Sequence, residues 1–145
     1  MKTTQTQQIS PIRVVGIAAW IDKGQAPQQI GALWGQAAQA GLLQPGQAGY
    51  GVYFDYADHL ASRYRVLVGA ESEAEPLQGQ EVVHIPEGTY TAFHGEGAAA
   101  EVVPEIWAHI WLGWPDSDKR TFNVDFERYV GSPDNSKIEV MIGVS

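Results

Sequence analysis

The first half of the chain alternates apolar runs with turn-forming residues in the order strand, helix, strand, strand. Residues 12–21 are rich in β-branched and small apolar side chains, which is typical of a buried strand. Pro27 suits the first turn of a helix, because its missing N–H is not needed there. Apolar residues then recur at helical spacing and end at a glycine: Ile30, Leu33, Trp34, Ala37 and Gly41. Residues 49–58 and 63–70 follow as a predicted hairpin.

The second half repeats this order. Residues 81–95 have a strand-like pattern, and its interruption at Pro86-Glu87-Gly88 predicts a bulge or a sheet edge. A helix follows whose apolar stripe ends at Pro115 and comprises Val103, Ile106, Trp107, Ile110, Trp111 and Trp114. Residues 124–130 and 138–144 form the last predicted hairpin.

Three segments of the first half have counterparts 72 to 74 positions later, in the same order: Phe54-Asp55-Tyr56 with Phe126-Glu127-Arg128, Leu33-Trp34 with Ile106-Trp107, and residues 65–69 with 139–143. We interpret the chain as two related βαββ units, roughly residues 9–75 and 80–145, joined by the acidic segment 71–79. This predicts an α+β fold with antiparallel sheets and both helices on one side.

Side-chain alternation in the last hairpin predicts that two acidic residues, Glu127 and Glu139, point away from the apolar face. Glu139 must point away from the apolar face of residues 138, 140, 142 and 144. If the hairpin is centred on Pro133, Glu127 lies nearly opposite Glu139, on the helix-free side. Two facing carboxylates repel each other, so either a positively charged partner relieves them or both are solvated on an exposed sheet face.

Composition narrows the classes of function. The formal net charge is −8, from 17 acidic residues against nine Lys and Arg, so nucleic-acid binding is disfavoured and a cationic ligand is favoured. The chain has no cysteine, no signal-like N-terminus and no apolar run of the ~20 residues that a membrane span needs, which favours the cytoplasm. We expect residues 1–8, which lack apolar periodicity, to form a flexible tail before a single domain of residues 9–145.

Several catalytic and cofactor chemistries find no support. The four histidines have no metal-ligand spacing, and the glycine pairs Gly49/Gly51 and Gly95/Gly97 do not open a phosphate-binding helix. No nucleophile elbow occurs. We therefore expect no metal site, no cofactor and no assigned catalytic residue.

The residues 85–95 (IPEGTYTAFHG), the tryptophan-containing helix end 111–115 (WLGWP), and the closing segments 125–129 (DFERY) and 138–144 (IEVMIGV) resemble the motifs of GyrI-like effector-binding domains. The resemblance covers nearly the whole chain after the first eight residues. One departure is Gly143, where the family usually has proline.

This resemblance implies a duplicated βαββ fold with a ligand cleft between the halves, which holds a hydrophobic, cationic small molecule. Glu127 then takes the role of the pocket glutamate and Glu139 that of a second acid. The aromatic walls are expected among Tyr53, Tyr90, Trp111 and Tyr129, since flat rings attract cations. We expect Trp34 and Trp107 to pack in the core.

The sequence also allows two other functions, a hydrolase and a protein-binding module. Some GyrI-like proteins hydrolyse small molecules, and Glu127 or Glu139 with Tyr129 or His94 could supply general acid–base groups. A gyrase-inhibitor-like protein-binding module is a third possibility. The partner is expected to be the small molecule, with a separate transcription regulator or a second copy as further candidates.

Overall fold

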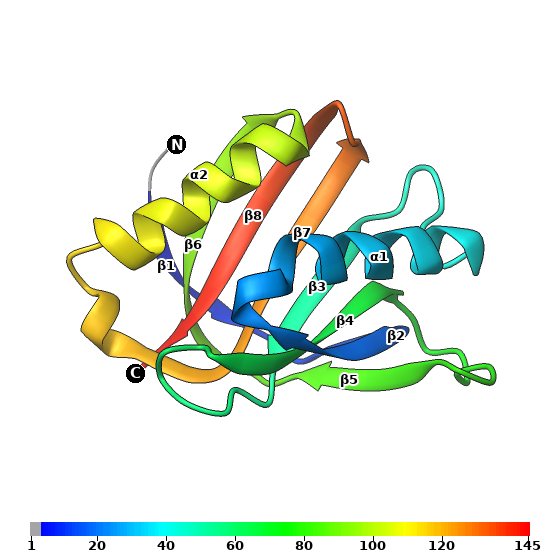
Figure 1. Cartoon of the computed structure of the whole chain (residues 1–145), viewed down its shortest axis with the longest axis horizontal. Helices are drawn as coiled ribbons and strands as arrows, with labels where there is room; N and C mark the ends of the chain where they lie inside the picture. Colours follow the sequence, from blue (N-terminus) through cyan, green and yellow to red (C-terminus); the bar gives the residue numbers. More distant parts are fainter. Residues whose placement is uncertain (1–3) are drawn as a thin grey trace.

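A computed structural model describes residues 4–145 as one antiparallel eight-stranded sheet with two helices. The elements are β1 (Thr4–Ile9), β2 (Ile12–Asp22), α1 (Ala26–Gln39), β3 (Gly49–Phe54), β4 (Arg63–Glu71), β5 (Glu81–Ile85), β6 (Gly88–Gly97), α2 (Ala99–Leu112), β7 (Arg120–Ser132) and β8 (Asn135–Val144). The strand order is β1-β6-β8-β7-β3-β4-β2-β5. The sheet curls, and both helices cover the same face of it (Figure 1). The predicted α+β class with both helices on one side is confirmed.

The strand registers show the internal duplication directly. The pair Gly51↔Val68 of β3 and β4 recurs 74 positions later as Asp125↔Ile142 of β7 and β8. The pair Ile17↔Val68 of β2 and β4 recurs at the same spacing as Thr91↔Ile142 of β6 and β8. The two units meet where β3 pairs with β7. A pseudo-twofold relation therefore runs through the middle of the sheet.

Each helix seals its own part of the core. α1 covers a cluster around Leu33, Ala37 and Val66, and α2 covers one around Ile106 and Ile110. A third cluster fills the helix-free concavity of the curled sheet, with buried residues Val14, Tyr50, Val52, Leu67, Ile85, Tyr90, Ala92, Phe126 and Met141. The helix-free face is therefore packed with apolar side chains rather than open.

The predicted hairpin register of β7 and β8 is wrong by one residue. The turn holds two residues between the paired Ser132 and Asn135, so its centre lies between Pro133 and Asp134. Glu127 consequently faces Val140, and Arg128 faces Glu139. A shift of one residue moves every side chain of a strand to the other face, so Glu127 lies on the helix side and not on the helix-free side.

The flexible tail predicted for residues 1–8 is wrong for Thr4 to Gln8, while residues 1–3 lie outside the described part. Residues 4–9 form strand β1 on the outer edge of β6. Gln8 Nε2 donates a hydrogen bond to Thr89 Oγ1 at 2.6 Å. An edge strand needs backbone partners more than apolar periodicity, which is why the apolar pattern gave no signal here.

The interruption at Pro86 separates two strands with different partners. β5 pairs with β2, whereas β6 pairs with β8 and β1. The predicted edge is correct for β5, which ends one side of the sheet, and Pro86 lies in the crossing between the two strands. Over residues 4–145, no helix is both long and apolar enough to cross a membrane.

Candidate functional site

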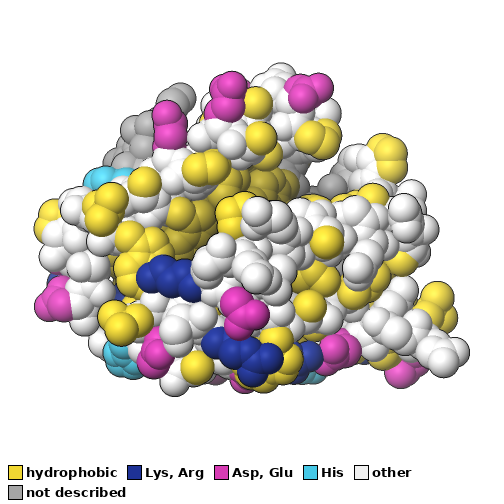
Figure 2. All heavy atoms as spheres, viewed as in Figure 1, with side chains coloured by type: hydrophobic (Ala, Val, Ile, Leu, Met, Phe, Trp, Pro, Cys, Tyr) yellow, Lys and Arg dark blue, Asp and Glu magenta, His cyan; other side chains and the backbone are white. Residues whose placement is uncertain are grey.

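A pocket of about 360 Å³ lies between the two helices and the sheet beneath them. Figure 2 shows hydrophobic side chains gathered in a hollow between α1 and α2, with a basic side chain at its rim. Seven aromatic side chains line the pocket: Trp34, Tyr53, Tyr56, Tyr64, Trp107, Trp111 and Tyr129. This volume is within the range of small-molecule sites.

The two helices present the same spacing of residues to the pocket. α1 contributes residues 26, 27, 30 and 34, and α2 contributes residues 103, 104, 107 and 111. The bounds of the two helices are 73 positions apart, so Ile30 corresponds to Val103 and Trp34 to Trp107, and both pairs line the pocket. Residues three, four and eight positions apart share one helix face, so each helix turns one proline-containing face inward.

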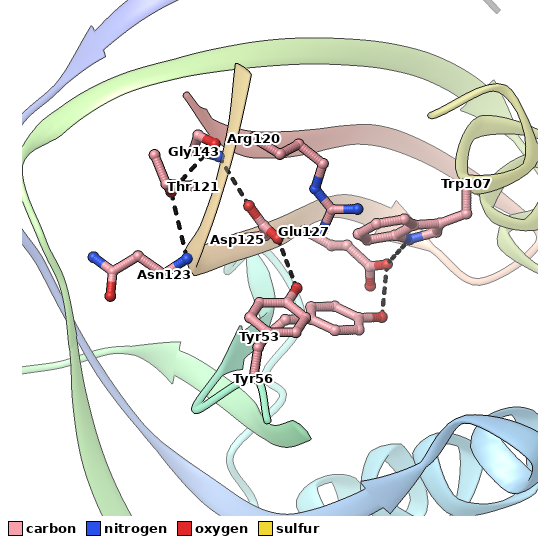
Figure 3. Close-up of polar contacts among 9 residues, drawn as sticks. All are labelled: Tyr53, Tyr56, Trp107, Arg120, Thr121, Asn123, Asp125, Glu127 and Gly143. Carbon is pink, nitrogen blue, oxygen red and sulfur yellow. Dashed lines mark hydrogen bonds and ion pairs between the residues drawn. The ribbon is translucent and has the colours of Figure 1, made fainter. Parts of the chain in front are cut away.

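Glu127 is the one acidic residue among the described residues that line this pocket, and its side chain is satisfied by three aromatic donors. Tyr53 Oη and Trp107 Nε1 donate to Glu127 Oε2 at 2.9 and 2.6 Å. Tyr129 Oη donates to Oε1 at 2.7 Å. Figure 3 shows the Tyr53 phenol and the Trp107 indole converging on the carboxylate. The rings that form the wall therefore also orient the acid.

Burial controls the protonation of this site. Glu127 is 1% exposed, and desolvation raises its pKa above the ordinary value, although the hydrogen bonds from Trp107, Tyr129 and Tyr53 act in the opposite direction. Burial and the neighbouring Glu127 carboxylate both raise the pKa of Tyr53 and of Tyr129. Both phenols therefore keep their protons and remain donors at neutral pH.

Gly51 makes room for the carboxylate from the neighbouring strand. It is paired with Glu127 across β3 and β7. A Cβ on Gly51 would lie 3.3 Å from Glu127 Oε1 and 3.5 Å from the Trp34 ring. The missing side chain allows Glu127 and Trp34 to approach the same point of the sheet.

A second polar group, Arg120, enters the pocket through an irregularity in β7. The ladder with β8 shifts between Arg120↔Val144 and Asp125↔Ile142, and Phe122 there has φ +53°. Without the shift, Arg120 would lie on the opposite face from Asp125 and Glu127, because seven positions separate it from Glu127. The shift places Arg120 on the helix side, where Nη2 pairs with Asp125 Oδ2 at 2.8 Å.

The mouth of the pocket carries a second positive charge. Lys23 Nζ lies 4.5 Å from the centre of the Trp111 ring and donates to the Leu60 carbonyl at 3.0 Å. The Arg120 guanidinium carbon lies 4.9 Å from the centre of the same ring. The pocket thus has an acidic end at Glu127 and a basic end around Trp111.

The structure brings four of the six predicted site residues together: Glu127, Tyr53, Tyr129 and Trp111 all line the pocket. Glu139 and Tyr90 do not line it. Glu139 is on the helix-free face, 3.3 Å from Arg128 Nη1 and 3.8 Å from His94 Nδ1. Tyr90 is 3% exposed in the core of that face and donates to the Pro86 carbonyl at 2.8 Å.

Trp34 and Trp107, which we expected only in the core, form pocket walls, and Trp107 also donates to Glu127. Trp34 and Trp107 occupy matching positions in the apolar stripes of the two helices. This match predicted packing in the core, and it fits a symmetric pocket equally well. Arg120 gave no sequence signal, because strand alternation assigns it to the opposite face. Gly51 lies in the predicted hairpin strand 49–58, where the only chemistry that its glycine suggested was phosphate binding.

The comparisons with known proteins agree with this architecture. The family model for Cass2, an integron-associated effector-binding protein, matches residues 7–144. An integron cassette protein from the mobile metagenome of Vibrio cholerae, VCH_CASS2, is 23% identical over 98% of this chain and 95% of its own, with a TM-score of 0.82.

Two further solved structures have the same fold. A putative transcription regulation protein from Staphylococcus aureus MU50 is 19% identical over 99% of this chain and 98% of its own, with a TM-score of 0.77. The structure of SAV2435 bound to tetraphenylphosphonium is 18% identical over 99% of this chain and 94% of its own, with a TM-score of 0.73. A search of curated protein sequences gave no match.

Proposed function

Because this chain belongs to the Cass2 family of integron-associated effector-binding proteins, we propose that it binds a hydrophobic organic cation in the pocket between α1 and α2. The observation that carries the proposal is the carboxylate of Glu127, buried at the base of a pocket with seven aromatic walls.

The physical case begins with the cost of the buried charge. An ionised carboxylate in an apolar site is unfavourable unless it is compensated, and its three neutral donors compensate it without neutralising it. An organic cation adds Coulomb attraction in a poorly solvated space. Its apolar surface also displaces water from the aromatic rings of the pocket. Each ring that faces the cation contributes about 0.5–2 kcal/mol of cation–π attraction.

The whole molecule supports the same sign of ligand. Its net charge of −8 attracts cations over the length of the Debye screening distance. Tetraphenylphosphonium, the ligand of the SAV2435 structure, combines a delocalised positive charge with an apolar surface. It is therefore the first probe for this chain.

A fluorescence titration tests the proposal. Trp34, Trp107 and Trp111 line the pocket, so bound ligand should change their emission. We expect saturable binding of tetraphenylphosphonium to the native protein and a loss of at least about ten-fold in affinity for Glu127→Gln, which is isosteric but uncharged.

The matched control is Glu139→Gln, which removes a carboxylate of the same type from the opposite face. We expect this variant to bind as the native protein does. Equal affinity of Glu127→Gln and the native protein would overturn the assignment of Glu127.

A further inference from the structure

Arg120 at the basic end of the pocket has hydrogen-bond donors that no group in the described chain uses. The residue is 7% exposed, and among residues 4–145 its Nε and Nη1 have no hydrogen-bond partner. Nη2 alone is bonded, to Asp125 Oδ2. A buried N–H without an acceptor is unfavourable, so these atoms point to a missing partner.

Asp125 bonds Arg120 through Nη2 alone, and its oxygens also accept from two other groups. Oδ2 accepts from Tyr56 Oη at 2.6 Å as well as from Arg120, and Oδ1 accepts from the Gly143 backbone N–H at 2.9 Å. Figure 3 shows Asp125 held between Tyr56 and Gly143, with the Arg120 guanidinium beside Trp107. Asp125 fixes the guanidinium in place and leaves its other donors free.

The Gly143 backbone belongs to the same network that positions Arg120, because its N–H donates to Asp125 Oδ1. Proline at this position would have no N–H to donate.

Aromatic rings cover the Arg120 guanidinium. Its guanidinium carbon lies 4.0 Å from the centre of the Phe122 ring and 4.9 Å from that of Trp111. Trp111 is 39% exposed, and the centre of its ring lies 6.1 Å from that of Phe122 and 4.5 Å from the Lys23 ammonium. Arg120 nevertheless lines the pocket between the two helices.

We infer that the Arg120 end of the pocket is a binding subsite for a hydrogen-bond acceptor oxygen, so that the ligand is an aromatic cation with a carbonyl group on the side away from its charge. The inference rests on the proposed cation site and adds the chemistry of the ligand's other end. Lys23 repels positive charge from the Trp111 end, and Glu127 attracts it to the opposite end, while Asp125 compensates the charge of Arg120.

The two ends are close enough for one small molecule to use both. Trp107 donates to Glu127 and also lies 5.9 Å, ring centre to guanidinium carbon, from Arg120. One indole therefore contacts both polar groups. A ligand needs little more than an aromatic ring between its charge and its carbonyl.

Two xanthene dyes separate the acceptor from the charge. Tetramethylrosamine and tetramethylrhodamine methyl ester carry the same delocalised cation, and only the second has an ester carbonyl on its phenyl ring. We expect the ester to bind the native protein about ten-fold more tightly, since a charge-assisted hydrogen bond contributes on this scale. Equal affinities would overturn the inference while leaving the cation site intact, whereas failure of both dyes to bind would refute the proposed function.

Arg120→Lys shows whether the gain comes from the guanidinium. Lysine keeps a positive charge for Asp125 but lacks the planar fork of donors, so we expect the ester's advantage to fall below about three-fold. Arg128→Lys, on the helix-free face, is the matched control and should keep the full advantage. If Arg120→Lys does not fold, the double variant Arg120→Met with Asp125→Asn removes the ion pair without leaving a buried charge. An undiminished advantage in either folded variant would overturn the inference.

Discussion

At the scale of single residues, Glu127 is a buried carboxylate that accepts hydrogen bonds from three aromatic side chains. Desolvation opposes its ionisation, and the hydrogen bonds from Trp107, Tyr129 and Tyr53 favour it. The balance leaves its pKa above the ordinary value of 4.5. Protonation and cation binding therefore compete for the same carboxylate.

Cation binding should weaken as the pH falls through the raised pKa of Glu127. The cation binds the ionised form, so affinity is greatest above this pKa and is lost below it. Without ligand the sign for stability is opposite: the folded state keeps the proton to higher pH than the unfolded state, so the free energy of unfolding falls as the pH rises from the unfolded pKa to the folded one. Calorimetric titrations from pH 4.5 to 8 check this, and Glu127→Gln should show no such pH dependence.

Trp107→Phe should raise the pH midpoint of cation binding. Phenylalanine keeps a ring but loses the N–H that donates to Glu127 Oε2, so the ionised carboxylate is less stabilised. We expect the binding midpoint to rise by about one pH unit and stability at pH 7.5 to fall by about 1–3 kcal/mol. Trp20→Phe, at a tryptophan outside the pocket, should leave the midpoint unchanged. An unmoved midpoint in Trp107→Phe would mean that the indole does not hold the acid.

At the scale of the elements, the contact between β3 and β7 sets the depth of the pocket. Gly51 on β3 leaves the space that the Glu127 carboxylate and the Trp34 ring share. The site thus depends on the absence of a side chain at Gly51 of β3 as much as on the carboxylate of Glu127 on β7.

Gly51→Ala should reduce both affinity and stability. The added Cβ would lie 3.3 Å from Glu127 Oε1, so the carboxylate or the ring must shift, at a cost of about 1–3 kcal/mol. Gly31→Ala in α1 is the control: nothing lies within 4 Å of its Cβ, and alanine is the better helix former by about 1 kcal/mol. Thermal unfolding and dye titration measure both variants. Gly51→Ala with native affinity would show that the shared space is not needed.

Both helices and most strands could be predicted from the sequence, but strand β1 and two features of β7 could not. Periodicity located α1 from Pro27 onward and the β7–β8 hairpin correctly. The two-residue turn after Ser132 then moved Glu127 to the helix side, because strand faces depend on a single residue of register. The irregularity at Phe122 turned Arg120 into the pocket, and local apolar pattern carries no information about such a shift.

At the scale of the whole molecule, two related units share one sheet and place the pocket near their pseudo-twofold relation. Each unit supplies one helix wall, and the strands β3 and β7 that pair at the junction supply the floor. The chemistry is asymmetric, however, because Tyr53 of the first unit corresponds to Glu127 of the second in the strand registers. Duplication explains the shape of the pocket, and divergence at such positions explains its polarity.

Strand β1 protects one edge of the shared sheet, and we expect its removal to affect the molecule as a whole. Deleting residues 1–9 exposes the edge of β6, which presents unpaired N–H and C=O groups. The truncated protein should unfold at a lower temperature and associate as its concentration rises, as measured by calorimetry and light scattering. A monomeric product with native stability would show that β1 contributes nothing to the fold.

The location of a bound cation tests the central claim most directly. Tetraphenylarsonium has the shape and charge of tetraphenylphosphonium, and its arsenic atom gives an anomalous signal in a crystal of the complex. We expect one strong arsenic peak between α1 and α2, beside the Glu127 carboxylate and among the rings of Trp34, Trp107 and Tyr129. A peak on the helix-free face near Glu139, with the pocket between the helices left without arsenic, would contradict the claim.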